Sequence, residues 1–269
     1  MKLYIGQQTP EHKGDTSREL INMWEESGYC EIIKNEVEDV FIWANSPNDV
    51  LLYEYDRFDV YPHLPKVWNR GLFGGMQSQD KRSSAWIYWA RHPRKLEKEI
   101  EKGLKTYDDR DVESVFLGRI ENHVQFVNRT KEDWESHVDL FSMPNVAEGV
   151  FKYPYTQDEY LEILSYSKFG LSMAGYGPKC NREIEYMGLG VVPIVTPEVD
   201  MTYYDPLEEG VHYFRAKNPI EFQSIVDQTS EERWGKMSKS CVDWYERNCS
   251  REGSFRTTER IVSQLPRHK

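Results

Sequence analysis

Residues 167–195 read SKFGLSMAGYGPKCNREIEYMGLGVVPIV. The apolar run 169–173 predicts a strand, and the glycine-rich loop 175–177 follows it. A helix is predicted over 181–188, and the apolar run 191–195 predicts a buried parallel strand. A strand, a glycine-rich loop, a helix and a second strand in this order favour an α/β layer structure.

The same alternation occurs elsewhere in the chain. The polar segment TYDDRDVES, residues 106–114, separates a first pattern from a second one that restarts at Val115. Thr156 and Glu159 form a capping box ahead of a helix in the second pattern. We therefore predict two domains, residues 1–110 and 111–269. In the first half, helices are predicted at 17–26 and from Pro93 to Gly103, and strands at 2–5, 41–44, 50–53 and 85–89.

The composition fits a folded, acidic protein. Hydrophobic residues make up 39% of the 269 residues and charged residues 29%, which suits packed cores. Lys and Arg number 34 against 45 Asp and Glu, giving a net charge of −11. A chain with this balance does not hold a polyphosphate backbone by bulk charge, so no nucleic acid is expected as a partner.

The sequence carries no signal for export or for a membrane. It turns polar after the first five residues, unlike a signal peptide. Its longest apolar run, around 188–195, is far shorter than the roughly 18 residues of a membrane span. The 4 cysteines form no CxxC pair and no Cys/His cluster of zinc spacing. We expect a cytoplasmic protein with free thiols and no bound metal.

Charged residues gather around the glycine-rich loop Gly175-Tyr176-Gly177. Its glycines let the backbone approach a ligand closely, and the following helix N-terminus offers free N–H groups and a positive dipole to a diphosphate. Lys179 and Arg182 add positive charge there. Arg182 and Glu185 share one helix face, so Arg182 can hold phosphate while Glu185 accepts hydrogen bonds from two ribose hydroxyls. A generic strand–loop–helix explains the glycines, but explains these charges less well.

At these residues the sequence resembles a known family. The pattern S-x-F…G-x-G…R-x-x-E-x-x-x-x-G-x-V-P-I-V is similar to the donor-binding part of exostosin-like glycosyltransferases, of the two-Rossmann-domain (GT-B) group. FLGRIENHVQFVNR, residues 116–129, is similar to the family's strand–glycine opening with a following Arg. The resemblance covers roughly residues 112–220, and no motif of the N-terminal half matches. The matching positions are Ser167, Phe169, Gly175, Gly177, Arg182, Glu185, Gly190, Val192 and Pro193.

The resemblance implies a fold and an activity. It implies two Rossmann-like α/β domains facing a cleft, with a C-terminal helix that can return to the first domain. The C-terminal domain would bind a nucleotide-sugar, with the diphosphate on Arg182 and the ribose on Glu185, and the N-terminal domain would bind a glycan acceptor. Arg119 and Arg129 are weaker candidates for phosphate contacts, and each can instead be a surface arginine. The expected donor is a UDP-sugar, and the chain's likeness to compact relatives encoded by large algal viruses suggests UDP-xylose as one choice. Transfer should not need a metal, because Lys179, Arg182 and the helix N-terminus would carry the diphosphate charge.

Family members of this type invert the anomeric centre, which needs one general base for the acceptor hydroxyl. The loop after the first strand holds His12 and Asp15, at the strand end where open α/β sheets build their sites. Asp56 follows the predicted strand 50–53. Our order of candidates is Asp15, Asp56 and His12. Asp15 can instead cap the helix that begins near Ser17, and His12 can simply be exposed.

Two other readings remain open. Glu54-Tyr-Asp56 after an apolar strand fits a metal-dependent transferase with one Rossmann-like domain (GT-A type). A nucleotide- or glycan-binding protein without catalysis would arise if no base is functional. A sugar-nucleotide epimerase or dehydrogenase would need GxGxxG near the start, where residues 4–20 contain only Gly6 and Gly14.

Overall fold

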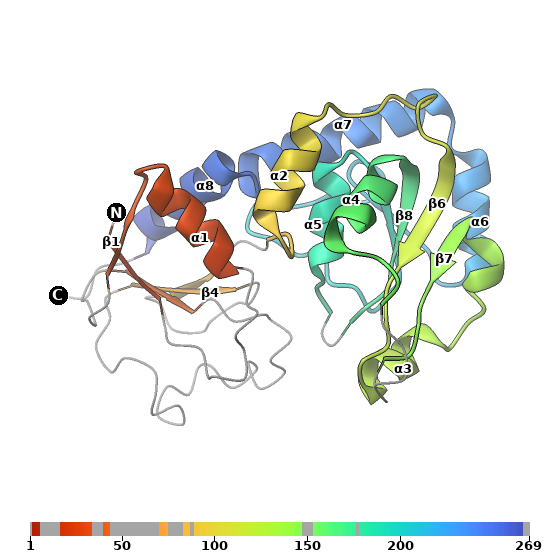
Figure 1. Ribbon diagram of the computed structural model, residues 1–269, viewed down its shortest axis with the longest axis horizontal. Helices are drawn as coiled ribbons and strands as arrows, with labels where there is room; N and C mark the ends of the chain where they lie inside the picture. The colour runs from red at the N-terminus through yellow and green to blue at the C-terminus, as the bar shows by residue number, and fades with distance from the viewer. Residues whose placement is uncertain are drawn as a thin grey trace. The chain divides into compact units, whose positions relative to one another are not determined.

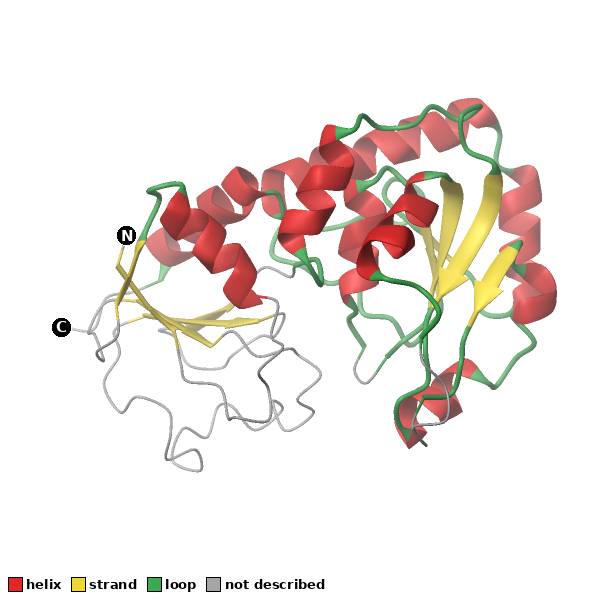
Figure 2. Ribbon diagram, viewed as in Figure 1, coloured by secondary structure: helices red, strands yellow, loops and turns green. Residues whose placement is uncertain are grey.

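The computed structural model describes residues 2–5, 17–33, 40–43, 70–74, 83–86, 89–146, 153–175 and 178–265 (Figure 1). The chain divides into two compact units. The first comprises Met1–Arg94, Tyr203–Asp205 and Glu246–Lys269, and the second comprises Lys95–Thr202 and Pro206–Tyr245. Each unit contains one parallel sheet with helices (Figure 2), which confirms the predicted α/β class.

The first unit is built on a five-stranded sheet in the order β2-β1-β3-β4-β5, in which all neighbours are parallel. Helix α1 (Ser17–Glu26) and helix α8 (Arg251–Gln264) belong to this unit. Trp24 Nε1 donates to Ser254 Oγ over 3.0 Å, and Phe255 meets the Trp24 ring edge-on, so the last helix packs on α1. The strands are β1 (Lys2–Ile5), β2 (Glu31–Ile33), β3 (Val40–Trp43), β4 (Arg70–Gly74) and β5 (Ser83–Trp86).

The second unit is built on a five-stranded parallel sheet in the order β10-β9-β8-β6-β7. The strands are β6 (Val112–Leu117), β7 (Leu140–Ser142), β8 (Ser167–Ser172), β9 (Val192–Val195) and β10 (Phe214–Arg215). The described helices of this unit are α3 (His123–Arg129), the 3-10 turn η3 (Glu135–His137), α4 (Gln157–Ser165), α5 (Asn181–Gly188) and α6 (Pro219–Gln228). Most of α2 (Pro93–Glu101) and of α7 (Glu231–Asn248) also belongs to it.

Both faces of the second sheet are covered, and β8 shows how. Side chains alternate between the two faces of a strand. Phe169 and Leu171 join a buried cluster that also contains Trp134 and Phe222. Gly170 lies on the opposite face against Tyr186 of α5, where a Cβ would sit 2.4 Å from the Tyr186 ring. Glycine at 170 is therefore required for α5 to lie close to the sheet.

The unit boundary differs from the sequence prediction near residue 110, because Lys95–Arg110 falls in the second unit. The polar segment 106–114 is anchored there by its one buried arginine. Arg110 donates to the carbonyl oxygens of Ser167, over 2.6 Å, and Leu189, over 2.8 Å. A segment that reads as a polar linker is thus tied into the second sheet.

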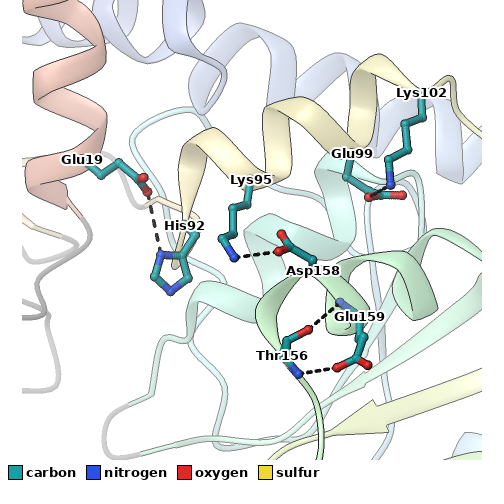
Figure 3. Close-up of polar contacts among 8 residues, drawn as sticks. All are labelled: Glu19, His92, Lys95, Glu99, Lys102, Thr156, Asp158 and Glu159. Carbon is teal, nitrogen blue, oxygen red and sulfur yellow. Dashed lines mark hydrogen bonds and ion pairs between the residues drawn. The ribbon is translucent and has the colours of Figure 1, made fainter.

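The capping box predicted at the start of α4 is confirmed (Figure 3). The Glu159 N–H donates to Thr156 Oγ1 over 3.2 Å, and the Thr156 N–H donates to Glu159 Oε2 over 2.7 Å. The ion pair between Lys95 and Asp158 links this first turn to α2. None of the described helices combines the length and the apolar character of a membrane-spanning segment.

Candidate functional site

The candidate site lies at the carboxyl ends of β6 and β8, the edge at which open α/β sheets bind ligands. Gly118 and Arg119 follow β6 directly, and Ala174 and Gly175 follow β8. Helices α3 and α5 begin shortly after these two loops. Two buried arginines, Arg129 of α3 and Arg182 of α5, reach this edge.

Arg182 is buried with most of its hydrogen-bonding capacity unused. The residue is 9% exposed, and its Nη2 donates to the Leu117 carbonyl over 3.2 Å. Its Nε and Nη1 are buried and have no hydrogen-bond partner among the described residues. The guanidinium carbon lies 4.5 Å from the centre of the Phe116 ring. A buried charged donor without a partner costs free energy, so these atoms indicate a site for a bound anion.

Arg129 brings a second positive charge to the same edge. It is 4% exposed, and its Nε donates to the Ala174 carbonyl over 3.1 Å and its Nη1 to the Arg119 carbonyl over 2.5 Å. Burial, together with the nearby charge of Arg182, lowers the pKa of Arg129 to about 10. Both groups remain protonated near neutral pH, so the edge holds two buried positive charges.

The glycines after β6 and β8 leave room for these arginines. A Cβ at Gly118 would lie 2.5 Å from the Phe116 ring and 3.1 Å from Arg182 Nη2. A Cβ at Gly175 would lie 3.3 Å from Arg129 Nη2. Sequence reasoning assigned Gly175 to close ligand approach, and the structure adds that it makes space for a guanidinium. Tyr176 and Gly177 lie outside the described residues.

Glu185 lies in the same buried group as Arg182. Its side chain is 2% exposed, and Tyr160 of α4 donates its hydroxyl hydrogen to Glu185 Oε2 over 2.9 Å. Burial, and then the Glu185 charge, raises the pKa of Tyr160 well above its usual value, so Tyr160 remains a donor. Burial also raises the pKa of the neighbouring Tyr153 to about 12, against the opposing effect of Arg182.

Lys179 is engaged differently from the sequence expectation. Its ammonium contacts the Asp200 carbonyl at 3.1 Å, the Asp200 carboxylate at 3.2 Å and the Thr202 carbonyl. A lysine ammonium has three N–H donors, and these three acceptors occupy them. The contacts join the loop after β8 to the loop after β9, so Lys179 links these two loops.

The N-terminus of α5 is also partly occupied. Glu183, fully buried, accepts from the Cys180 N–H over 2.7 Å and from the Ser172 hydroxyl. The sequence predicted free N–H groups at this helix N-terminus. The Cys180 N–H is not free, because the carboxylate three residues later folds back onto it as in a capping box.

Of the remaining predicted site residues, Arg119 lies among the described residues, and the candidate bases do not. Arg119 pairs with Glu121 over 2.6 Å and has a third of its side chain exposed. Among the described residues, no three His, Cys, Asp or Glu side chains come together as metal ligands would. The candidate bases Asp15, Asp56 and His12, and the Glu54 of the metal-dependent alternative, lie outside the described residues.

Sequence reasoning missed Phe116 and Tyr160, which contact Arg182 and Glu185 respectively. Phe116 belongs to an ordinary apolar strand, and Tyr160 to an ordinary amphipathic helix. Neither residue carries a local signal, because each acts through a neighbour on a different element.

No protein-family model matches the sequence, and no curated protein matches it. The chain is similar to solved structures of HepE from Anabaena. The HepE complex with UDP has a TM-score of 0.55 at 8% identity, covering 98% of this chain and 100% of that one. The complex with UDP-glucose has a TM-score of 0.54 at 9% identity, with the same coverage.

A third HepE structure, with UDP and glucose, has a TM-score of 0.53 at 8% identity and covers 98% of this chain and 99% of that one. The likeness shows the fold. The similarity covers nearly the whole chain and supports the predicted α/β, Rossmann-like fold. The HepE structures with this fold contain UDP or UDP-glucose.

Proposed function

We propose that this chain is a glycosyltransferase that takes its sugar from a nucleotide-diphosphate donor, a UDP-sugar. The observation that carries the proposal is Arg182, a buried guanidinium with two nitrogens that lack a partner among the described residues. Arg129 adds a second buried guanidinium nearby. Two such groups at the carboxyl edge of a parallel sheet suit a diphosphate, which carries several acceptor oxygens. The fold shared with UDP-bound HepE supports the choice of nucleotide.

The arginines account for the chemistry of the leaving group. When the bond between the sugar and the diphosphate breaks, negative charge grows on the diphosphate. Arg182 and Arg129 lie where little water reaches them, so their attraction for this charge is less screened than at a surface. Fixed positive groups then do what a divalent cation does in metal-dependent transferases, and we propose that transfer needs no metal.

Glu185 completes the donor site in this proposal. Its carboxylate accepts hydrogen bonds from ribose hydroxyls, while Tyr160 holds one of its oxygens. Arg119 is a secondary phosphate contact at the rim. Lys179 contributes indirectly, because it fixes the loop that leads into α5.

The remaining steps are assigned to the N-terminal domain. We propose that it binds a glycan acceptor, and that Asp15, with Asp56 and His12 next, takes the proton from the attacking hydroxyl. Direct displacement inverts the anomeric centre, and the resemblance to viral enzymes suggests xylose as the sugar. Asp15→Asn is expected to bind UDP like the wild type and to lose transfer. Normal turnover by this variant would move the base to Asp56.

Thermal unfolding with UDP, GDP, ADP and CMP, each with and without Mn²⁺, tests the donor assignment. A ligand at about 100 times its Kd adds roughly 2.7 kcal/mol of stability, or about 5–10 °C for a chain of this size. We expect this shift with UDP alone, independent of Mn²⁺. Stabilisation only with Mn²⁺ would favour the metal-dependent alternative, and no shift with any nucleotide would contradict the proposal.

A further inference from the structure

Phe116, at the end of β6, contacts both arginines of the candidate site. Its side chain is fully buried. The guanidinium carbon of Arg182 lies 4.5 Å from the ring centre, and that of Arg129 lies 5.7 Å from it. The ring reaches the carboxyl edge of the sheet, since a Cβ at Gly118 would lie 2.5 Å from its Cζ.

Two buried guanidinium groups repel each other, and groups of the protein must offset this repulsion; the buried Glu183 carboxylate is one of them. Burial, and then the charge of Arg182, lower the pKa of Arg129, while Glu183 and Glu121 offset part of this effect. The face of an aromatic ring is negative and attracts a cation, more strongly where water is excluded. One ring within reach of both groups therefore offsets part of their repulsion.

The contact with the ring also takes up no N–H donor of Arg182, whose Nε and Nη1 have no hydrogen-bond partner among the described residues. A guanidinium that lies against an aromatic face keeps its N–H groups in its own plane, where they can still meet an acceptor. Arg182 is fixed further by one carbonyl, that of Leu117, and Arg129 by two, those of Ala174 and Arg119. Ring and carbonyls together set both planes before a ligand arrives, which reduces the ordering cost of binding.

We propose that Phe116 is a positioning residue, which orients Arg182 and Arg129 as a preformed clamp for a diphosphate. This inference rests on the proposed function, because the diphosphate belongs to the nucleotide-sugar. Phe116 itself touches the arginines and not the phosphate.

Phe141 of β7 provides a matched control. It is the cross-strand neighbour of Phe116, and the two rings stack with centres 5.3 Å apart and an angle of 27°. The described contacts place no guanidinium against the Phe141 ring. Phe116→Leu and Phe141→Leu each break the same stacked pair, but only the first removes the surface under the arginines. Phe116→Met and Phe141→Met repeat the comparison with an unbranched side chain, should Leu hinder folding.

The first readout is calorimetric binding of UDP and of uridine. Phe116→Leu is expected to weaken UDP binding about 10-fold, as cation–π contacts of this kind predict, and to leave uridine binding unchanged. Phe141→Leu is expected to change neither by more than about 2-fold. Equal weakening of UDP by the two variants, or equal loss of UDP and uridine binding in Phe116→Leu, would overturn the positioning role.

The second readout does not depend on nucleotide binding. In a protein with ¹⁵N-labelled arginine, the Nε–H signals of Arg182 and Arg129 feel the ring current of Phe116. We expect both signals to move in Phe116→Leu and to stay nearly in place in Phe141→Leu. Failure of wild-type UDP binding would then count against the proposed function, whereas unmoved arginine signals in Phe116→Leu would overturn the role of Phe116.

Discussion

Lys179 and Arg182 stand three residues apart, both are buried and both lie at the carboxyl edge of the second sheet, yet their surroundings differ. Lys179 places its ammonium against three oxygens of the loop that contains Asp200 and Thr202. Arg182 gives one nitrogen to the Leu117 carbonyl and leaves two without a partner among the described residues. A positive charge that is satisfied within the chain supports structure, and one left unsatisfied is available to a ligand.

The largest expected effect is on Arg182. We predict that Arg182→Met weakens UDP binding at least about 100-fold, because two charge-assisted hydrogen bonds are lost. Folding stability should fall by only about 1 kcal/mol, since one hydrogen bond disappears while a desolvated charge is also removed. Calorimetry and urea unfolding measure the two quantities on the same preparations.

Arg119→Met is the comparison variant, because Arg119 is proposed as only a secondary phosphate contact at the rim, is partly exposed and pairs with Glu121. It should weaken UDP binding by less than about 3-fold. If the Arg182→Met variant binds UDP normally, or does not fold, the distinction between a structural Lys179 and a ligand-binding Arg182 is contradicted.

Lys179 should show the opposite pattern. We predict that Lys179→Met lowers the free energy of unfolding by about 2 kcal/mol, because the acceptors of Asp200 and Thr202 lose their buried donor. UDP affinity should change by less than about 3-fold once the variant is folded, since the ammonium has no donor left for phosphate. Lys131→Met, which removes an exposed ion pair with Glu198, is the control and should cost almost nothing. A large loss of UDP affinity with unchanged stability would restore Lys179 as a ligand.

The sequence predicts the strands and helices around Lys179 and Arg182, but it does not predict the different surroundings of the two side chains. The strand, helix and strand of residues 167–195 appear at Ser167–Ser172, Asn181–Gly188 and Val192–Val195. Periodicity and caps are local, so a short stretch of sequence predicts them. The partner of Lys179 comes from the loop after another strand, and Phe116 reaches Arg182 because β6 and β8 are neighbours.

The first unit shows a different limit of sequence reasoning. The predicted strands 2–5 and 41–44 correspond closely to β1 and β3, whereas β2 and β4 were not predicted. Strand β2 has only 3 residues, and β4 reads RGLFG, with two glycines that weaken a strand signal. The predicted strand 50–53 lies outside the described residues. Strands β2 and β4 therefore depend on pairing with neighbouring strands, because their own sequences have weak strand propensity.

Glu185 extends the comparison to a negative charge. We predict that the wild type prefers UDP over 2′-deoxy-UDP and that Glu185→Gln lowers this preference about 10-fold. The amide has one acceptor oxygen, which the Tyr160 hydroxyl engages, whereas the carboxylate has a second oxygen for the ribose. Gln keeps an oxygen for the Tyr160 hydroxyl, so folding should be little affected. Competition binding with the two nucleotides measures the preference. An unchanged preference would make the Glu185–Tyr160 pair purely structural.

The smallest effect is expected for Glu183→Gln, which should change only the pH dependence of the free energy of unfolding. Burial raises the pKa of Glu183 above the ordinary 4.5, so the unfolded chain ionises first as the pH rises. Wild-type stability should therefore be highest below pH 4.5 with respect to this group, and should fall as the pH rises through the folded-state pKa. Glu183→Gln should lack this decline, and UDP affinity should stay unchanged. Urea unfolding across the acidic range compares the two slopes, and identical slopes would contradict the assignment.

The central claim is that Arg182 holds the diphosphate rather than the nucleoside. Calorimetric titration of the wild type and Arg182→Met with UDP and with uridine tests it most directly. The account predicts that the wild type binds UDP at least about 100-fold more tightly than uridine, and that Arg182→Met loses most of this advantage while binding uridine as before. An Arg182→Met protein that keeps the full preference for UDP over uridine would contradict the account.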